Sequence, residues 1–167
     1  MIGTVCVLAL LALIDGACAG FRSSVGRTGL VRHRAADLRA AVHGVVLVVA
    51  LLLPATAIAA GAVAAGASAR DFAAAGDWML RILIPYAAAV LLALLAYGVL
   101  GWRQKYLAMA LVLGPFTLVR PAVAVAAAVV GCITAGNGLI SLAIGLSVGA
   151  VLAVEPVLDR WWSRAEA

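Results

Sequence analysis

Residues 11–40 read LALIDGACAGFRSSVGRTGLVRHRAADLRA, in which an apolar run that contains one carboxylate, Asp15, is followed by a stretch with five arginines. The apolar run belongs to a segment, residues 1–21, that is long enough to cross a bilayer, which takes about 20 residues. Short loops rich in Arg and Lys are retained in the cytoplasm. The stretch therefore predicts a membrane helix followed by a basic cytoplasmic loop over residues 22–39.

The composition of the 167-residue chain is typical of a membrane protein throughout. It is 66% hydrophobic and only 11% charged, whereas soluble domains are roughly 45–50% apolar and about 25% charged. A chain of this length has room for about four to six spans and no sizeable soluble domain. We therefore predict an all-α, polytopic transmembrane helical bundle that forms a single domain over residues 1–167.

Turn-forming and charged residues divide the chain into five apolar segments, with approximate bounds 1–21, 40–65, 79–101, 107–135 and 139–157. Residues 70–77 carry balanced charge and are expected to form a short outer loop. At about 1.5 Å per residue the fourth segment is roughly 44 Å long, more than the ~30 Å of hydrocarbon. We therefore expect a break at Gly114-Pro115 or Arg120-Pro121, as a tilted broken helix or a re-entrant half-helix.

The basic residues set the expected orientation. With five spans, an N-out/C-in orientation puts nine of the twelve basic residues in the cytoplasm, in agreement with the positive-inside rule. These nine are Arg22, Arg27, Arg32, Arg34, Arg39, Arg103, Lys105, Arg160 and Arg164. A signal peptide cleaved near Ala17-Cys18-Ala19 is the alternative, but it would leave the basic loop outside. Arginine far outnumbers lysine and alanine is abundant, which suggests GC-rich bacterial coding, so we expect a multi-pass protein of the bacterial cytoplasmic (inner) membrane.

Ionisable side chains within apolar spans are costly and are therefore candidates for function. Asp15, His43, Arg120 and Glu155 make up a candidate intramembrane polar site. Asp15 lies six residues before Phe21, hence ~9 Å along the helix from the expected cytoplasmic edge, and Glu155 lies at a matching depth. A re-entrant fourth segment would return Arg120 to this depth, whereas a continuous helix would place it much deeper and require another partner.

Each of these residues also has an ordinary structural explanation. Asp15 could pair with Arg22, and Glu155 with Arg160, because side chains near the membrane boundary can reach water. His43 is close to the expected start of the second span, where histidines are usually interfacial. For Arg120, which has no acid nearby in sequence, structural and functional roles are equally open.

The arginines of residues 22–39 offer a cationic surface for anionic lipid headgroups or a partner protein, or they serve as a topology determinant alone. They are Arg22, Arg27, Arg32, Arg34 and Arg39. Because topology accounts for the net charge of +5, we expect no nucleic-acid binding. Small residues recur every four positions at Ser141, Gly145, Gly149 and Ala153, which predicts close helix packing within the chain or in a homodimer.

One part of the chain resembles the bacterial CDP-alcohol phosphotransferases. Their pattern, Asp-x2-Asp-Gly-x2-Ala-Arg-x8-Gly-x3-Asp-x3-Asp, supplies acids that bind metal and activate the alcohol. The matching positions are Asp15, Gly16, Ala19, Gly29 and Asp37, and the departing ones are Ala12, Gly20 and His33. The resemblance implies a lipid-headgroup enzyme. The departures remove the arginine and two of the four acids, whereas a divalent metal needs several oxygen ligands.

The sequence contains no P-loop, HExxH or GxGxxG motif, and Cys6, Cys18 and Cys132 are isolated from one another. We therefore expect a non-enzymatic protein without metal or cofactor. Its expected role is as a small subunit or accessory factor of a membrane transport or cell-envelope assembly system, acting with a membrane protein partner or as a homo-oligomer. Two alternatives remain: a lipid-headgroup phosphotransferase-like enzyme with a degenerate Asp-Gly motif, and a small transporter or channel in which Arg120 lines a polar path.

Overall fold

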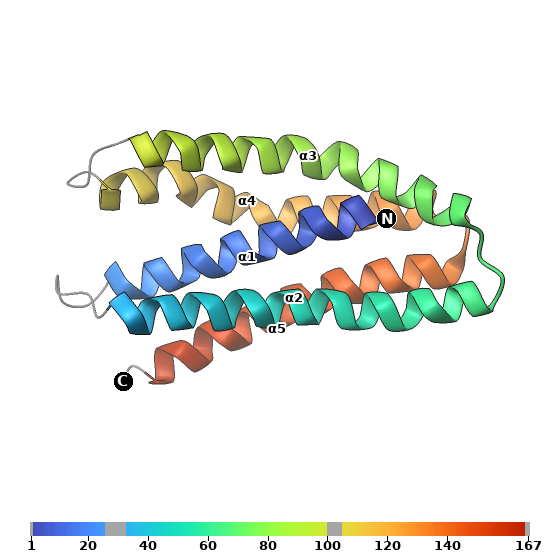
Figure 1. Ribbon diagram of the computed structural model, residues 1–167, viewed down its shortest axis with the longest axis horizontal. Helices are drawn as coiled ribbons and strands as arrows, with labels where there is room; N and C mark the ends of the chain where they lie inside the picture. The colour runs from blue at the N-terminus through green and yellow to red at the C-terminus, as the bar shows by residue number, and fades with distance from the viewer. Residues whose placement is uncertain (1, 26–32, 100–104, 166–167) are drawn as a thin grey trace.

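The computed structural model describes the backbone of residues 2–25, 33–99 and 105–165, and the side chains of residues 3–15, 41–96, 114–162 and 164. Five helices occupy nearly all of these ranges: α1 (Ile2–Val25), α2 (His33–Ala64), α3 (Ala69–Val99), α4 (Lys105–Thr134) and α5 (Gly138–Ala165). Figure 1 shows them side by side in one bundle, with each helix antiparallel to the next along the chain. The prediction of an all-α bundle is confirmed.

Four of the helices contain stretches that are long and apolar enough to cross a membrane, and α1 adds a shorter apolar stretch, Gly3–Asp15. Many large apolar side chains lie on the outside of the bundle: Leu118 is 81% exposed and Ile133 is 77% exposed. Monomeric soluble proteins rarely expose extensive apolar surface, whereas a bilayer solvates it. The protein is therefore a multi-pass integral membrane protein whose outer surface contacts lipid.

The helices close into a ring, and this arrangement positions the candidate site. α1 packs against α2 and α3, α4 packs against α3 and α5, and the contact between α2 and α5 completes the circle. The largest core cluster includes Leu11, Leu83 and Ile144 from three different helices. A ring of this kind directs residues of all five helices toward one interior.

Two glycines permit the closest approaches between helices. A Cβ atom added at Gly44 would lie 3.3 Å from Cδ2 of Leu13, and one added at Gly131 would lie 2.6 Å from Sδ of Met79. Small residues at helix contacts are the usual means of close packing in membranes, because lipid provides no hydrophobic drive between helices. Gly44 thus sets the spacing of α2 and α1, and Gly131 that of α4 and α3.

The small-residue repeat on α5 packs inward at its first member only. Ser141 Oγ donates to the carbonyl oxygen of Cys132 at 2.9 Å, and Cys132 Sγ lies 3.3 Å from the carbonyl oxygen of Ser141. A Cβ added at Gly145 or Gly149 would meet nothing within 4 Å, and Ala153 is exposed. The repeat therefore joins α5 to α4 at Ser141 and then turns to the outside of the bundle.

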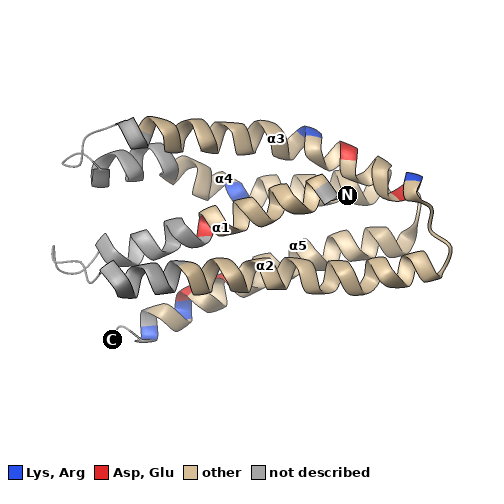
Figure 2. Cartoon of the chain, viewed as in Figure 1, with Lys and Arg blue, Asp and Glu red and all other residues tan. Residues whose placement is uncertain are grey.

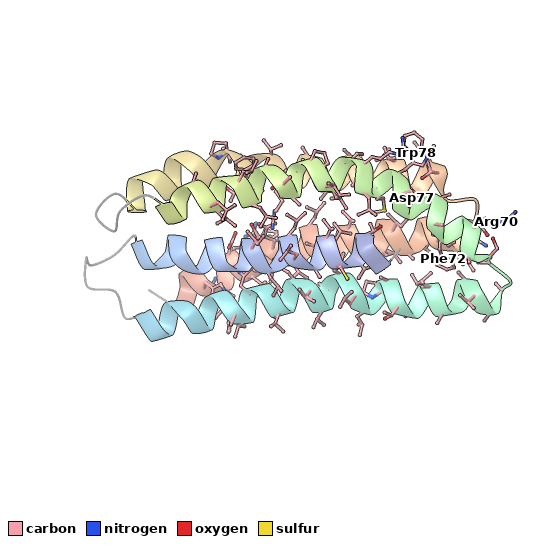
Figure 3. All side chains as sticks on the ribbon, turned by 45° about the horizontal axis from the view of Figure 1, so that its top comes forward. Arg70, Phe72, Asp77 and Trp78 are labelled. Atoms are coloured by element: carbon pink, nitrogen blue, oxygen red, sulfur yellow. The ribbon has the colours of Figure 1, made fainter. Side chains whose placement is uncertain are left out.

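Residues 70–77 are helical, so the prediction of an outer loop there is wrong. Ser68 precedes α3, and its N–H and hydroxyl both donate to Oδ2 of Asp71 at 2.9 Å. The bond from the Ser68 N–H to the Asp71 carboxylate is one half of a capping box and satisfies a donor at the start of the helix. It starts α3 at Ala69, about ten residues before the expected span. Figure 3 shows Arg70 at the outer end of the helix and Asp77 and Trp78 further along it.

The basic loop is shorter than predicted. α1 continues to Val25 and α2 begins at His33, so Arg22, Arg34 and Arg39 stand on helices. Arginine is a good helix former, and helices can continue beyond the hydrocarbon where their backbone bonds are already made within the helix. Arg27 and Arg32, and the side chains of all five arginines, lie outside the described residues.

α4 is continuous, so the predicted break in the fourth segment is wrong. Pro115 and Pro121 both lie inside the helix, and the axis bends in its yellow-to-orange stretch (Figure 1). Thr117 Oγ1 donates to the carbonyl oxygen of Gly114 at 2.7 Å, and the Tyr86 hydroxyl donates to that of Phe116 at 2.8 Å. The carbonyls that lose a helical N–H partner are those of Leu111 and Thr117, four residues before each proline, so these two bonds support the bent stretch of α4 without replacing the missing ones.

Candidate functional site

Three of the four predicted site residues meet inside the ring. The Arg120 guanidinium on α4 forms one ion pair with Asp15 on α1 through Nη1 and a second with Glu155 on α5 through Nη2. We call this set of three residues the charge triad. Figure 2 shows an acidic position of α1 beside a basic position of α4 within the bundle, away from the charges near its ends. The triad ties three helices together with full charges.

The triad forms although α4 is continuous, which corrects the expectation that a continuous helix would hold Arg120 too deep. α1 and α5 each extend about ten residues, or ~15 Å, beyond their carboxylates, to Val25 and Ala165. Measured from the helix ends on this side of the bundle, both acids therefore lie ~15 Å inward. Arg120 lies fifteen residues from the start of α4, roughly 22 Å, and its long side chain spans the remaining difference.

Because the triad is largely buried, its net charge has a large energetic cost. The side chains of Asp15, Arg120 and Glu155 are 4%, 14% and 20% exposed, respectively. Charges removed from water are costly unless they are paired, and a membrane interior raises that cost further. Arg120 neutralises one carboxylate fully, so the second leaves the triad with one negative charge when all three groups are ionised.

Three cavities lie in a row inside the ring. A cavity of about 40 Å³ is lined by Thr4 and Ser147, and one of about 50 Å³, lined by residues of all five helices, includes Arg120. A third, of about 20 Å³, is lined by both Asp15 and Arg120. The first two share Leu8, Leu51 and Val148, and the last two share Leu11, Tyr86 and Arg120. Arg120 thus lies at the junction of the last two cavities and Asp15 lines the smaller of them, whereas Glu155 reaches this junction only through its ion pair with Arg120.

Two polar residues of this region were not among the predicted site residues. Tyr86 and Thr117 line the 20 Å³ cavity together with Asp15 and Arg120. A cavity of this volume has room for about one water among four polar side chains. The available signal was their position: Tyr86 directly follows Pro85 within an apolar span, and Thr117 lies three residues before Arg120.

His43 is buried, in contrast to its expected interfacial position. α2 begins ten residues before it, and the histidine is only 1% exposed. Its neighbour Gly44 packs against Leu13, and Leu47, one turn later, clusters with Ala12 and Leu158. His43 therefore lies at the level of Asp15, on the side of the ring where α2 meets α1.

The described side chains do not assemble a metal site. Within them, no group of three or more His, Cys, Asp or Glu residues is close enough to hold a metal ion. Asp15, the best match to the phosphotransferase pattern, is engaged by Arg120, and Asp37 is among the residues whose side chains are not described. The geometry thus uses Asp15 as an ion-pair partner.

Comparisons with known proteins identify no family for this chain. No protein-family model matches the chain, and neither curated proteins nor solved structures gave a significant match. The helix ring, its cavities and the charge triad are therefore the features that indicate a function.

Proposed function

We propose that this protein is a non-enzymatic component of a membrane transport system and that a narrow path for a small solute runs along the inside of its helix ring. The observation that carries the proposal is the row of three cavities with Arg120, the shared member of both ion pairs, at one junction. Buried ionisable residues that face the interior of a membrane bundle commonly mark ion or proton pathways.

The row of cavities accounts for a large part of the distance across the membrane. Its lining residues on α1 extend from Thr4 to Asp15, a rise of roughly 16 Å, or about half of the ~30 Å hydrocarbon. Polar side chains stand at both ends of this distance. The path proposed here therefore needs only a modest rearrangement at each end of the row to reach the membrane surfaces.

An apolar neck separates the first two cavities. Leu8, Leu51 and Val148 come from α1, α2 and α5 and line both of them. Apolar constrictions can close a pore by excluding water. In this proposal the described structure corresponds to a closed state, in which the neck and the triad interrupt the path.

The proposal is tested by flux through liposomes that contain the purified full-length chain. Vesicles loaded with a pH-sensitive dye and vesicles loaded with a chloride-sensitive dye report movement of protons and of a small anion. Val148→Phe adds bulk at the neck and should lower the flux that the wild type shows in either assay. Leu118→Phe is the matched control, because Leu118 faces lipid with 81% of its surface exposed and should leave the flux unchanged.

Two results would count against a transport path. One is a wild type that conducts neither probe, and the other is equal flux in Val148→Phe and the wild type although both variants fold. Circular dichroism and a single symmetric peak in gel filtration establish folding for each variant.

A second candidate function, an accessory subunit that binds another membrane protein or a second copy of this chain, is supported by the outer face of α5. Gly145 and Gly149 have open space where a Cβ would be, and Ala153 continues the same face. Small residues at such spacing permit a second helix to approach closely. The double variant Gly145→Leu/Gly149→Leu should abolish co-purification of the partner or cross-linking of two copies, whereas Leu142→Ala on the same helix should retain it.

A further inference from the structure

We propose that the charge triad binds one exchangeable proton and that Glu155 is the group that takes it up and releases it. The inference rests on the proposed transport function and names the proton as the class of solute. It differs from anion conduction, which an isolated Arg120 in an apolar span would have favoured.

Charge balance is the first argument. The triad contains two carboxylates and one guanidinium, so these three groups together carry one net negative charge when all are ionised. Among the described residues that line the two adjoining cavities, Arg120 is the sole cation. Because an unneutralised charge in a medium of low dielectric is costly, the triad favours binding a cation and disfavours an anion.

The size and chemistry of the site favour a proton over a metal ion. The adjoining polar cavity measures about 20 Å³, and the guanidinium already contacts both carboxylates. Ca²⁺ takes six to eight oxygen ligands and Mg²⁺ about six, which two shared carboxylates do not supply. A proton needs one carboxylate oxygen and no additional space.

Exposure and backbone geometry distinguish the two acids. The Glu155 side chain is 20% exposed and that of Asp15 is 4% exposed, so Glu155 is the more accessible to an incoming proton. Pro156 follows it and has no N–H, which removes the helical donor for the Leu152 carbonyl one turn earlier. That carbonyl, in a residue that lines the 50 Å³ cavity, provides an acceptor for a protonated carboxyl group.

The step balances in charge and atoms. A proton moves from water to a carboxylate oxygen of Glu155, forming one O–H bond and giving up the ion pair with Arg120. Arg120 keeps its pair with Asp15, so the triad changes from one net negative charge to neutral. Release of the proton to water restores the second ion pair, and no oxidation or reduction is involved.

Every helix of the ring brings a titratable or charged group to the same region. α1 contributes Asp15, α2 contributes the buried His43, and α3 contributes Tyr86, whose hydroxyl donates to the Phe116 carbonyl. On α5, Asp159 and Arg160 are exposed about one turn beyond Glu155. Of these groups His43 is the competing proton acceptor, because its level along α2 matches that of Asp15.

Infrared difference spectroscopy of the full-length protein in liposomes tests the assignment. The wild type should show the C=O stretching band of a protonated carboxyl group, and the band should disappear as the pH is raised. Glu155→Gln should remove the band and lower proton flux by about tenfold or more. Asp159→Asn, which changes an exposed acid on the same helix, should keep both.

A pH-dependent carboxyl band that persists in Glu155→Gln would overturn the assignment, as would the lack of such a band in the wild type at any pH at which it is folded. If Glu155→Gln fails to fold, Glu155→Asp replaces it and should shift the band; an unshifted band would again overturn the assignment. The proposed function fails separately: a wild type that has the band but conducts neither probe retains the proton site without the path. Flux without the band would leave the path without the proton site.

Discussion

The two halves of the helix ring are held together by different chemistry. Around Arg120, three helices meet through full charges. Toward the N-terminus of α1, helices are joined by neutral hydrogen bonds, such as that from Thr4 Oγ1 to the Gly76 carbonyl at 3.1 Å. We call these the charged half and the neutral half.

The difference separates a part of the molecule that can change state from a part that cannot. Ion pairs in the charged half depend on the protonation of two carboxylates, and their strength varies with a single proton. Hydroxyl and carbonyl groups in the neutral half do not titrate in the physiological range, and Gly131 adds a tight contact there. The neutral half therefore serves as a fixed frame against which α1, α4 and α5 can rearrange near the triad.

The largest effect should come from removing the shared cation. Arg120→Leu removes the guanidinium from two largely buried carboxylates, and breaking a buried pair in this way costs about 3–5 kcal/mol. Unfolding in mixed detergent micelles measures this loss. Arg81→Leu is the control: its guanidinium lies 4.4 Å from the Trp78 ring centroid on the exposed side of α3, and its loss should cost ~0.5–1 kcal/mol. Equal free energies of unfolding for the two variants would show that the ion pairs of Arg120 stabilise the fold no more than the exposed contact of Arg81.

A smaller effect is expected from overpacking in the neutral half. Gly131→Val places methyl groups where a Cβ alone would already lie 2.6 Å from Met79 Sδ and 3.2 Å from Ile144 Cδ1. Overpacking of this kind costs about 1–3 kcal/mol. Gly145→Val, with open space around the added atoms, should be close to neutral in the same unfolding assay. A Gly131→Val variant as stable as Gly145→Val would mean that the helices around Gly131 can move apart and accommodate the larger side chain.

Losing one neutral hydrogen bond should matter least among the single changes. Thr4→Val keeps the shape of a side chain that is 2% exposed but removes the bond to Gly76, and such bonds average ~0.6 kcal/mol in membrane proteins. Thr56→Val is the control, because Thr56 bonds only to carbonyls of its own helix, at Leu52 and Leu53, on the outside of the bundle. A loss at Thr4 comparable to that at Arg120 would abolish the distinction between the halves.

The sequence was informative about which residues are unusual and less so about their partners. Hydropathy identified five helical segments, and the cost of burying charge singled out Asp15, Arg120 and Glu155. Their pairing depends on how three helices distant in sequence are staggered, which local periodicity does not encode. Sequence proximity suggested Arg22 and Arg160 as local partners, and the Arg22 side chain lies outside the described residues; the pairing of Arg120 with both acids across the ring has no counterpart in local sequence.

Helix ends were the other source of error. Hydropathy marks where the hydrocarbon begins, but the backbone can remain helical beyond it, as at Val25 and His33. The capping interaction of Ser68 with Asp71 was visible as a Ser-x-x-Asp pattern and would have predicted the early start of α3. Prolines suggested a break in α4, but each proline removes only one backbone donor, and the helix continues through both of them.

Replacing all three residues of the charge triad should have the smallest effect on stability. The same change is the sharpest test of the role of the charged half. The triple variant Asp15→Leu/Arg120→Met/Glu155→Leu removes both ion pairs and leaves no unpaired charge. Replacing a buried ionic group by apolar residues of similar volume is often neutral or stabilising. The free energy of unfolding of the triple variant should therefore lie within about 1 kcal/mol of the wild-type value. Proton flux should nevertheless be lost, because the exchangeable group is gone. A triple variant that is stable and still conducts protons would show that the triad only holds helices together. A triple variant that is stable but conducts no protons would show that the triad is required for transport and not for folding.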